Sequence, residues 1–255
     1  MRLTRANYHG KKANVEYMSV SQFKSFKKCE ARALAEIKGE YVREESTALL
    51  VGSYVDAYFD GTMDKFTKAH PEMFKKDGSL KADFAKANEI IARIEKDAQF
   101  MRYLKGKKQC IMTGTIKDVP VKIMMDVYLP GKRIVDRKIM ADFDRKYDES
   151  LGWIPFYEAW GYDTQGGVYQ EIVRQNIGEK LPFYLGAATK EKIPDIDLIY
   201  MEQSTLDIAL EDFENNVERY DAIKKGIIPP ERCNKCDYCK STKVLTEPTS
   251  SDEYI

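Results

Sequence analysis

Hydrophobic residues recur at helical spacing through the first hundred positions. Three segments carry apolar residues three and four positions apart, which is typical of helices with one buried face. They span residues 21–38, 44–61 and 80–104. The first would begin at Ser21 as its cap, include Cys29, and stop at Gly39, a residue that readily ends helices. We therefore expect the N-terminal part, residues 1–105, to be mostly helical.

The spacing changes after this helical part. Three short β-branched segments, separated by Lys-Asp and Pro-Gly, predict an antiparallel meander. Helical spacing returns later, two more strands follow, and a last helix precedes a cysteine-rich stretch. The expected ranges are 108–116, 119–129 and 132–140 for the meander, 150–178 for the helical part, 182–190 and 196–202 for the strands, and 204–226 for the last helix. This order predicts an α/β or α+β domain with a mixed sheet flanked by helices.

The composition favours one large soluble domain. The chain has 255 residues, 41 basic against 41 acidic side chains, and no apolar run long enough to span a membrane. We expect a single domain over residues 1–243, a flexible tail over 244–255, and a cytoplasmic location. The neutral balance gives no overall nucleic-acid signal, although residues 1–43 hold ten basic against four acidic residues. The basic stretches near both ends could still contact phosphate.

Charged residues interrupt the meander where apolar ones surround them. Asp126 lies before the Pro-Gly turn, and Asp136 and Lys138 lie two apart after it, on one face of a strand. A two-residue turn would place Asp126 opposite Val135, whereas a three-residue loop centred on Gly131 would place it opposite Asp136. We expect the second. Two neighbouring carboxylates repel each other unless a cation lies between them, and Mg²⁺ prefers such oxygen ligands.

This pattern alone is weak, because an exposed salt bridge on a hairpin would look the same. Both strands are apolar on both faces, however, and buried charges are costly unless they are compensated. Two further segments add candidates. Asp56 lies on an otherwise apolar helix, and Gln165 and Tyr169 lie one helical turn apart.

Taken in chain order, these charged and polar residues resemble the motifs of the PD-(D/E)XK nucleases. Within that superfamily they resemble the phage-type group of RecE, RecB and lambda exonuclease. That group shows G-x3-H on a helix, then D, then D/E-x-K after a hairpin, then Q-x3-Y. The corresponding residues are Gly52, Asp56, Asp126, Asp136, Lys138, Gln165 and Tyr169, within a catalytic core of about residues 45–203. The chain departs from the pattern at Asp56, where many members carry histidine.

The resemblance implies a role for each residue. Asp56, Asp126 and Asp136 would bind Mg²⁺ or Mn²⁺, and Lys138 would orient the attacking water or stabilise the developing charge. Gln165 and Tyr169 would position DNA and the lysine. Tyr169 has an alternative interpretation as a core aromatic residue of its helix.

A second motif, Cys-x2-Cys-x2-Cys, lies in a C-terminal module over residues 228–243. Cys233, Cys236 and Cys239 supply three thiolates, so a fourth ligand must come from elsewhere, and Cys29 is the candidate. The order of one early and three late cysteines is similar to AddB-type nucleases, and this resemblance implies a 4Fe-4S cluster. Zn²⁺ is the alternative metal, and reduced, empty cysteines are the remaining possibility. Cys110, within a strand, is most simply a small core residue.

The resemblance implies an Mg²⁺-dependent exonuclease that degrades double-stranded DNA from its ends during phage or prophage recombination. Such enzymes often form rings and pass the remaining strand to a single-strand annealing protein. Two alternatives stay open. One is a nicking or structure-specific endonuclease of the same superfamily, and the other is a non-catalytic DNA-binding or adaptor protein with a zinc knuckle.

Overall fold

A five-stranded mixed sheet forms the centre of the protein. The computed structural model describes residues 1–43, 46–245, 247–248 and 250, so part of the expected tail lies outside the described residues. The strand order is β1-β2-β3-β6-β7, in which β3 and β6 are parallel and the other neighbours antiparallel. The strands are β1 (Lys107–Ile116), β2 (Val119–Leu129), β3 (Arg133–Met140), β6 (Phe183–Thr189) and β7 (Ile196–Tyr200). The expected mixed sheet and the antiparallel meander are confirmed.

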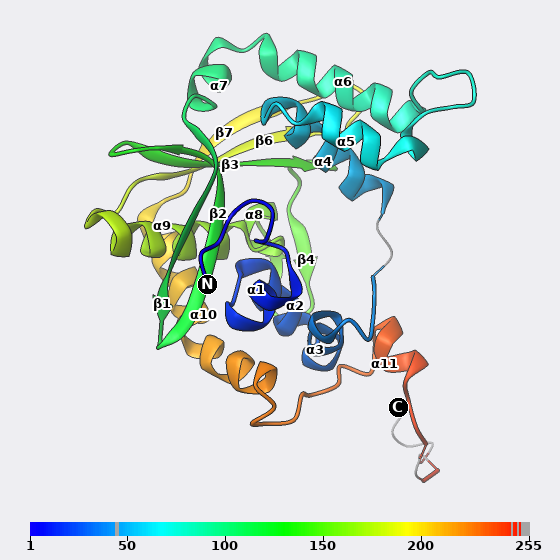
Figure 1. Ribbon diagram of the computed structural model, residues 1–255, viewed down its shortest axis with the longest axis vertical. Helices are drawn as coiled ribbons and strands as arrows, with labels where there is room; N and C mark the ends of the chain where they lie inside the picture. Colours follow the sequence, from blue (N-terminus) through cyan, green and yellow to red (C-terminus); the bar gives the residue numbers. More distant parts are fainter. Residues whose placement is uncertain (44–45, 246, 249, 251–255) are drawn as a thin grey trace.

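Helices cover the sheet on two sides (Figure 1). One side carries α4 (Thr47–Phe59), α5 (Met63–Ala69), the 3-10 turn η1 (Pro71–Met73), α6 (Ala82–Glu95) and α7 (Ala98–Tyr103). The other carries α1 (Lys11–Glu16), α2 (Val20–Lys28), α3 (Glu30–Lys38), α9 (Tyr162–Ile177) and α10 (Gln203–Lys224). Each side buries its own hydrophobic cluster against the strands. No helix in the described part of the chain is long and apolar enough to cross a membrane.

The single helix expected over residues 21–38 is wrong. The chain forms α2 and α3 instead, because Cys29 between them is extended, with φ −169° and ψ 110°. Ser19, not Ser21, caps α2 by accepting the backbone N–H of Gln22. Gly39 ends α3 in the left-handed conformation, as expected. The break orients the chain around Cys29 toward the C-terminal segment, because the Ala31 N–H donates to the Glu231 carbonyl.

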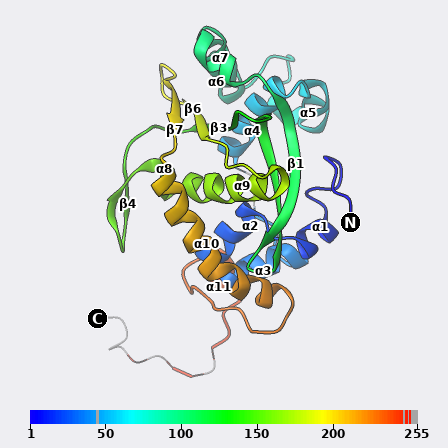
Figure 2. The same ribbon diagram turned by 90° about the vertical axis from the view of Figure 1, so that its left-hand side faces the viewer.

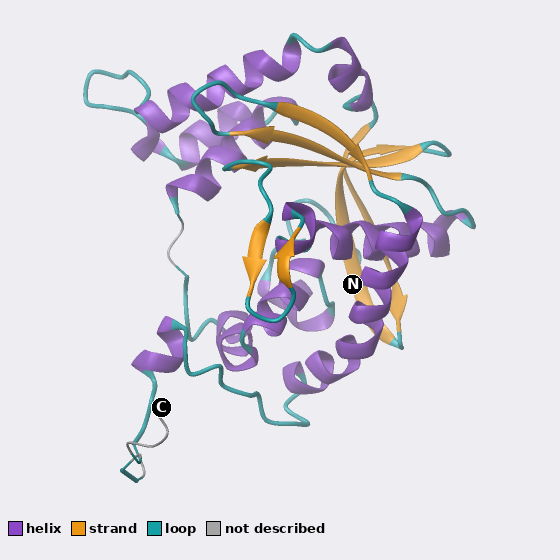
Figure 3. Ribbon diagram, turned by 180° about the vertical axis from the view of Figure 1, so that it is seen from behind, coloured by secondary structure: helices purple, strands orange, loops and turns teal. Residues whose placement is uncertain are grey.

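The helical spacing expected over residues 80–104 and 150–178 also contains interruptions. Asp97 separates α6 from α7 and caps the latter through the Phe100 N–H. Residues 146–154 form a separate hairpin of β4 (Lys146–Asp148) and β5 (Gly152–Ile154), which projects from the body (Figures 2 and 3). The short helix α8 (Phe156–Ala159) follows it, and a last short helix, α11 (Asp237–Ser241), lies in the cysteine module.

Candidate functional site

The loop between β2 and β3 determines which acidic residues share a face. Val127 pairs with Val135 and Leu129 with Arg133, so three residues, Pro130 to Lys132, form the loop. Extended by one residue beyond its last pair, this register would align Asp126 with Asp136. The three-residue loop centred on Gly131, which has φ 66°, is therefore confirmed.

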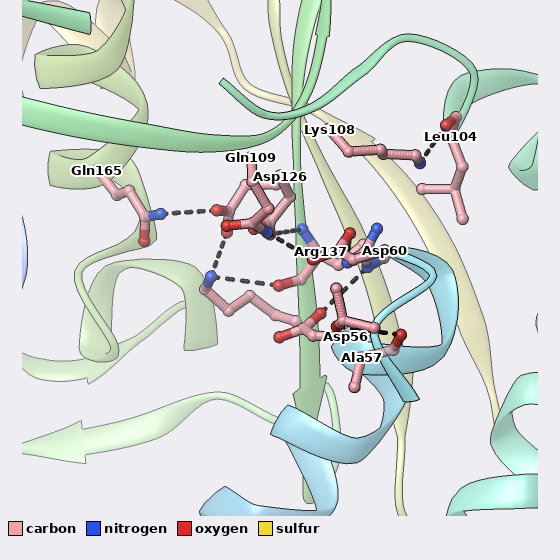
Figure 4. Close-up of polar contacts among 12 residues, drawn as sticks. Asp56, Ala57, Asp60, Leu104, Lys108, Gln109, Asp126, Arg137 and Gln165 are labelled. Atoms are coloured by element: carbon pink, nitrogen blue, oxygen red, sulfur yellow. Dashed lines mark hydrogen bonds and ion pairs between the residues drawn. The ribbon is translucent and has the colours of Figure 1, made fainter. Parts of the chain in front are cut away.

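Buried Asp136 and partly exposed Lys138 form the centre of the candidate site. Asp136 is only 2% exposed, and its carboxylate forms an ion pair with the Lys138 ammonium. Its Oδ1 also accepts a hydrogen bond from Gln165 Nε2 at 2.7 Å, which ties α9 to β3 (Figure 4). Lys138 Nζ further donates to the Arg137 carbonyl at 3.2 Å. The predicted residues from β3 and α9 thus meet at one point.

Asp126 lies where β2 and β3 separate. Their paired residues end at Val127 and Val135, and beyond that point the Arg137 N–H donates to Asp126 Oδ2 at 2.9 Å. Asp126 Oδ1 accepts from Gln109 Nε2 at 3.1 Å (Figure 4). The carboxylate thus receives one protein N–H on each oxygen, which defines its orientation beside Asp136.

The Arg137 side chain points away from Lys138, as expected for its neighbour on a strand, but it is almost fully buried. Its Nε pairs with Asp56 Oδ1 at 3.1 Å, and its Nη2 pairs with Asp60 Oδ1 at 2.9 Å. Asp56 and Asp60 lie one turn apart at the end of α4. Sequence reasoning missed Asp60 and the ion pairs of the Arg137 side chain. The spacing of two acids on one face of an apolar helix was the available signal.

Tyr169 anchors a strand. It is 8% exposed, belongs to the hydrophobic core beside α9, and donates from its hydroxyl to the Met124 carbonyl at 3.1 Å. This hydrogen bond holds β2 two residues before Asp126. The contacts therefore favour the interpretation of Tyr169 as a core residue that supports the site.

Burial and, second to it, neighbouring negative charge determine the electrostatics of the site. Burial raises the pKa of Asp136 to about 6, with Asp126 adding to the rise and Lys138 opposing it. Burial and then the charge of Asp126 raise the pKa of Asp56 to about 7, despite Arg137. Although burial acts against its charge, Asp136 and Asp126 raise the pKa of Lys138 above its ordinary value, so this lysine stays protonated.

The carboxyl groups of Asp56, Asp126 and Asp136 are of the kind that binds a divalent metal ion. The donors are carboxylate oxygens, which Mg²⁺ and Mn²⁺ prefer. Two of the three carboxyl groups have raised pKa values, and a nearby cation would favour their ionised forms. Asp126 and Asp136 lie on adjacent strands, and Asp56 approaches from α4.

The four predicted cysteines come together around one point. Their Sγ atoms all lie within 4.8 Å of one another, and Cys29 Sγ lies 3.5 Å from Cys239 Sγ. Cys236 Sγ lies 3.8 Å from Cys29 Sγ. Burial opposes the thiolate of Cys233, but N–H groups of Lys235 and Cys236 lower its pKa to about 6. Cys110 is separate from this group and packs against the core, as expected.

Comparisons with known proteins agree with this arrangement. Residues 19–242 match the family described as "PDDEXK-like domain of unknown function (DUF3799)". The chain belongs to the PDDEXK-like family. The PD-(D/E)XK resemblance stated above is therefore confirmed. No curated protein matches the chain.

Two solved structures are similar to this PDDEXK-like chain. One, from Eubacterium rectale and described as a "putative exonuclease", is 48% identical, with a TM-score of 0.96 over 100% of this chain and 98% of that chain. The other, SSO0001, is 11% identical over 78% of this chain and 94% of that chain, and its TM-score of 0.29 supports no argument. The first similarity extends over the whole chain, beyond the residues that the family model matches.

Proposed function

We propose that this PDDEXK-like protein is a metal-dependent exodeoxyribonuclease that degrades double-stranded DNA from its ends. The observation that carries the proposal is the contact of buried Asp136 with Lys138 and with Gln165 of α9, beside Asp126 on the neighbouring strand. A relative described as a "putative exonuclease" supports the exonuclease class. The resemblance to phage-type enzymes supports a setting in recombination, with a ring-shaped oligomer and an annealing partner.

The residues would divide the chemistry between them. Asp126 and Asp136, with Asp56 beside them, would hold one or two Mg²⁺ or Mn²⁺ ions. Such an ion polarises the scissile phosphate and lowers the pKa of the attacking water. Lys138 keeps its proton, so it would act as a fixed positive charge near the phosphate rather than as a base. Gln165 would hold the Asp136 carboxylate through its amide.

Digestion of end-labelled linear duplex DNA in Mg²⁺ tests the proposal. We expect Asp136→Asn to abolish cleavage and Lys138→Ala to slow it by about 10²-fold or more, because each removes charge stabilisation of the transition state. Lys132→Ala, in the exposed loop between β2 and β3, is the matched control and should cleave normally. Full activity of either site variant would contradict the proposed site.

Covalently closed circles distinguish the alternatives. An exonuclease leaves them intact, whereas a nicking or structure-specific endonuclease cuts them. DNA binding without cleavage in either Mg²⁺ or Mn²⁺ would favour a non-catalytic adaptor.

For the cysteine cluster we propose a single Zn²⁺ ion. Four sulfurs at 2.3 Å from one tetrahedral ion lie roughly 3.8 Å apart. Three of the six thiol pairs here lie 3.5, 3.8 and 3.9 Å apart, and all lie within 4.8 Å. A 4Fe-4S cluster, implied by the AddB-type resemblance, places four irons and four sulfides between its thiolates and needs wider separations. Elemental analysis should find one zinc per chain, lost in Cys233→Ser. A brown protein containing iron would overturn the assignment.

A further inference from the structure

Gln109 adopts a backbone conformation that residues with side chains rarely occupy. Its φ is 49°, in the left-handed region, although it lies inside strand β1. The regular pairs Lys108 with Val127 and Cys110 with Met125 flank it, so the register places Gln109 opposite Asp126. The distortion of β1 therefore occurs directly across from a proposed metal ligand.

The Gln109 side chain joins two carboxylates that belong to different elements. Its Nε2 donates to Asp60 Oδ2 at 2.6 Å and to Asp126 Oδ1 at 3.1 Å (Figure 4). A primary amide carries two N–H groups, and each carboxylate receives one of them. The contact links α4 to β2 and separates two negative charges that would otherwise repel each other.

A closed ring of hydrogen bonds results. Arg137 Nη2 donates to the second oxygen of Asp60, and the Arg137 N–H donates to the second oxygen of Asp126. Gln109 and Arg137 thus hold Asp126 from both sides. Each Asp126 oxygen accepts one of these bonds and keeps a further lone pair available.

We propose that Gln109 is a positioning residue that orients Asp126 for metal binding, and that the strained backbone of β1 exists to bring its amide to that carboxylate. The inference rests on the proposed function, because it takes Asp126 as a metal ligand. Partners that orient a metal ligand typically change metal affinity by about 10–100-fold when they are removed.

Gln109→Gly separates this role from a purely structural one. Glycine accepts the left-handed conformation without strain, so the thermal midpoint should not fall greatly, yet the amide is lost. Titration calorimetry should show Mn²⁺ binding weakened by about tenfold or more. The Mg²⁺ concentration for half-maximal cleavage of linear duplex should rise by a similar factor.

Lys117→Gly is the matched control. Lys117 is also a non-glycine residue in the left-handed region, with φ 47°, but it lies exposed at the turn between β1 and β2. Relief of strain at Lys117 should leave Mn²⁺ affinity unchanged. Gln109→Met retains a side chain of similar length without the amide, and it provides the same comparison if the glycine variant does not fold.

The outcomes distinguish the two proposals. Wild-type protein that neither binds Mn²⁺ nor cleaves DNA would overturn the proposed function itself. Wild-type protein that does both, with unchanged Mn²⁺ affinity in Gln109→Gly and Gln109→Met, would overturn the positioning role alone. Weakened Mn²⁺ binding in the Gln109 variants, with normal binding in Lys117→Gly, supports it.

Discussion

Arg137 compensates two acids at the end of α4, one of which, Asp56, is a proposed metal ligand. Its side chain is 1% exposed and pairs with Asp56 and Asp60. The Asp56 side chain is 40% exposed, so only the pair with Asp60 is buried on both sides. Removal of one partner from such a buried pair leaves an uncompensated charge, which typically costs about 3–5 kcal/mol. We therefore expect Arg137→Met to lower the free energy of unfolding by about that amount, as measured by urea denaturation.

Arg102→Met is the control for this substitution. Arg102 is exposed at the end of α7, and its replacement should change the free energy of unfolding by less than about 0.5 kcal/mol. If both variants lose equal stability, the buried ion pair between Arg137 and Asp60 contributes nothing specific.

The raised pKa of Asp136 makes metal-free stability depend on pH. Its folded value of about 6 exceeds the ordinary 3.8, so the folded state binds the proton more tightly than the unfolded state. Stability contributed by this group is complete below about pH 4 and is lost as pH rises through about 6, by about 3 kcal/mol in total. Urea denaturation of wild type and Asp136→Asn with a chelator should show this loss only in wild type. A parallel pH dependence in both proteins would contradict the assignment.

The residues of the candidate site divide into those that local pattern predicts and those it does not. Asp126, Asp136 and Lys138 could be predicted because strand alternation and loop length decide which side chains share a face. Gln109 and Arg137 could not, because their contacts arise where β2 leaves β3 and where β1 departs from regular strand geometry. Such departures depend on the whole sheet rather than on neighbouring residues.

At the scale of elements, α9 packs closely because of two adjacent glycines. A Cβ on Gly167 would lie 2.5 Å from the Leu206 carbonyl oxygen of α10, a backbone atom that cannot easily move. Gly167→Ala should therefore destabilise the protein by about 1–3 kcal/mol, despite alanine's better helix propensity. Thermal denaturation measures the change.

Gly52 in α4 provides the opposite case. A Cβ there meets nothing within 4 Å, so Gly52→Ala should stabilise the protein by up to about 1 kcal/mol. If Gly167→Ala and Gly52→Ala change stability in the same direction, close packing of α9 against α10 does not explain the effect at Gly167. Loss of cleavage in a stable Gly52→Ala variant would indicate that substrate uses this space.

Periodicity predicted most elements but not their interruptions. The helices α4 and α10 and the five strands of the main sheet follow from the spacing of apolar residues. The break at Cys29 follows from contacts with residues two hundred positions later, which local spacing does not contain. The β4 and β5 hairpin is too short and too exposed to show a clear alternation of polar and apolar residues.

At the scale of the whole molecule, the C-terminal segment fastens to the N-terminal helices. Arg219 of α10 pairs with Glu30 through two nitrogens, and the Glu231 N–H donates to the same carboxylate. The cysteine cluster adds a second attachment beside it. Both ends of the described domain thus stabilise each other on one side of the sheet.

Loss of the cluster should loosen this segment first. We expect Cys233→Ser, or treatment of wild type with a strong chelator, to increase tryptic cleavage after Lys235 and Lys240, because ordered backbone resists proteases. Limited proteolysis with mass spectrometry identifies the sites. Cys110→Ser, in β1 outside the cluster, is the control and should be cleaved like wild type. Unchanged cleavage in Cys233→Ser would show that the thiols do not hold the segment.

The distance along the chain between Glu30 and its partners has a consequence for biosynthesis. During translation, α2 and α3 leave the ribosome long before residues 219–239 exist, so Cys29 and Glu30 remain without these partners for most of the synthesis. A nascent chain that stops before residue 219 cannot close this side of the molecule, whatever the state of its sheet. Completion of the C-terminal segment is therefore the step at which the N-terminal helices acquire their final contacts.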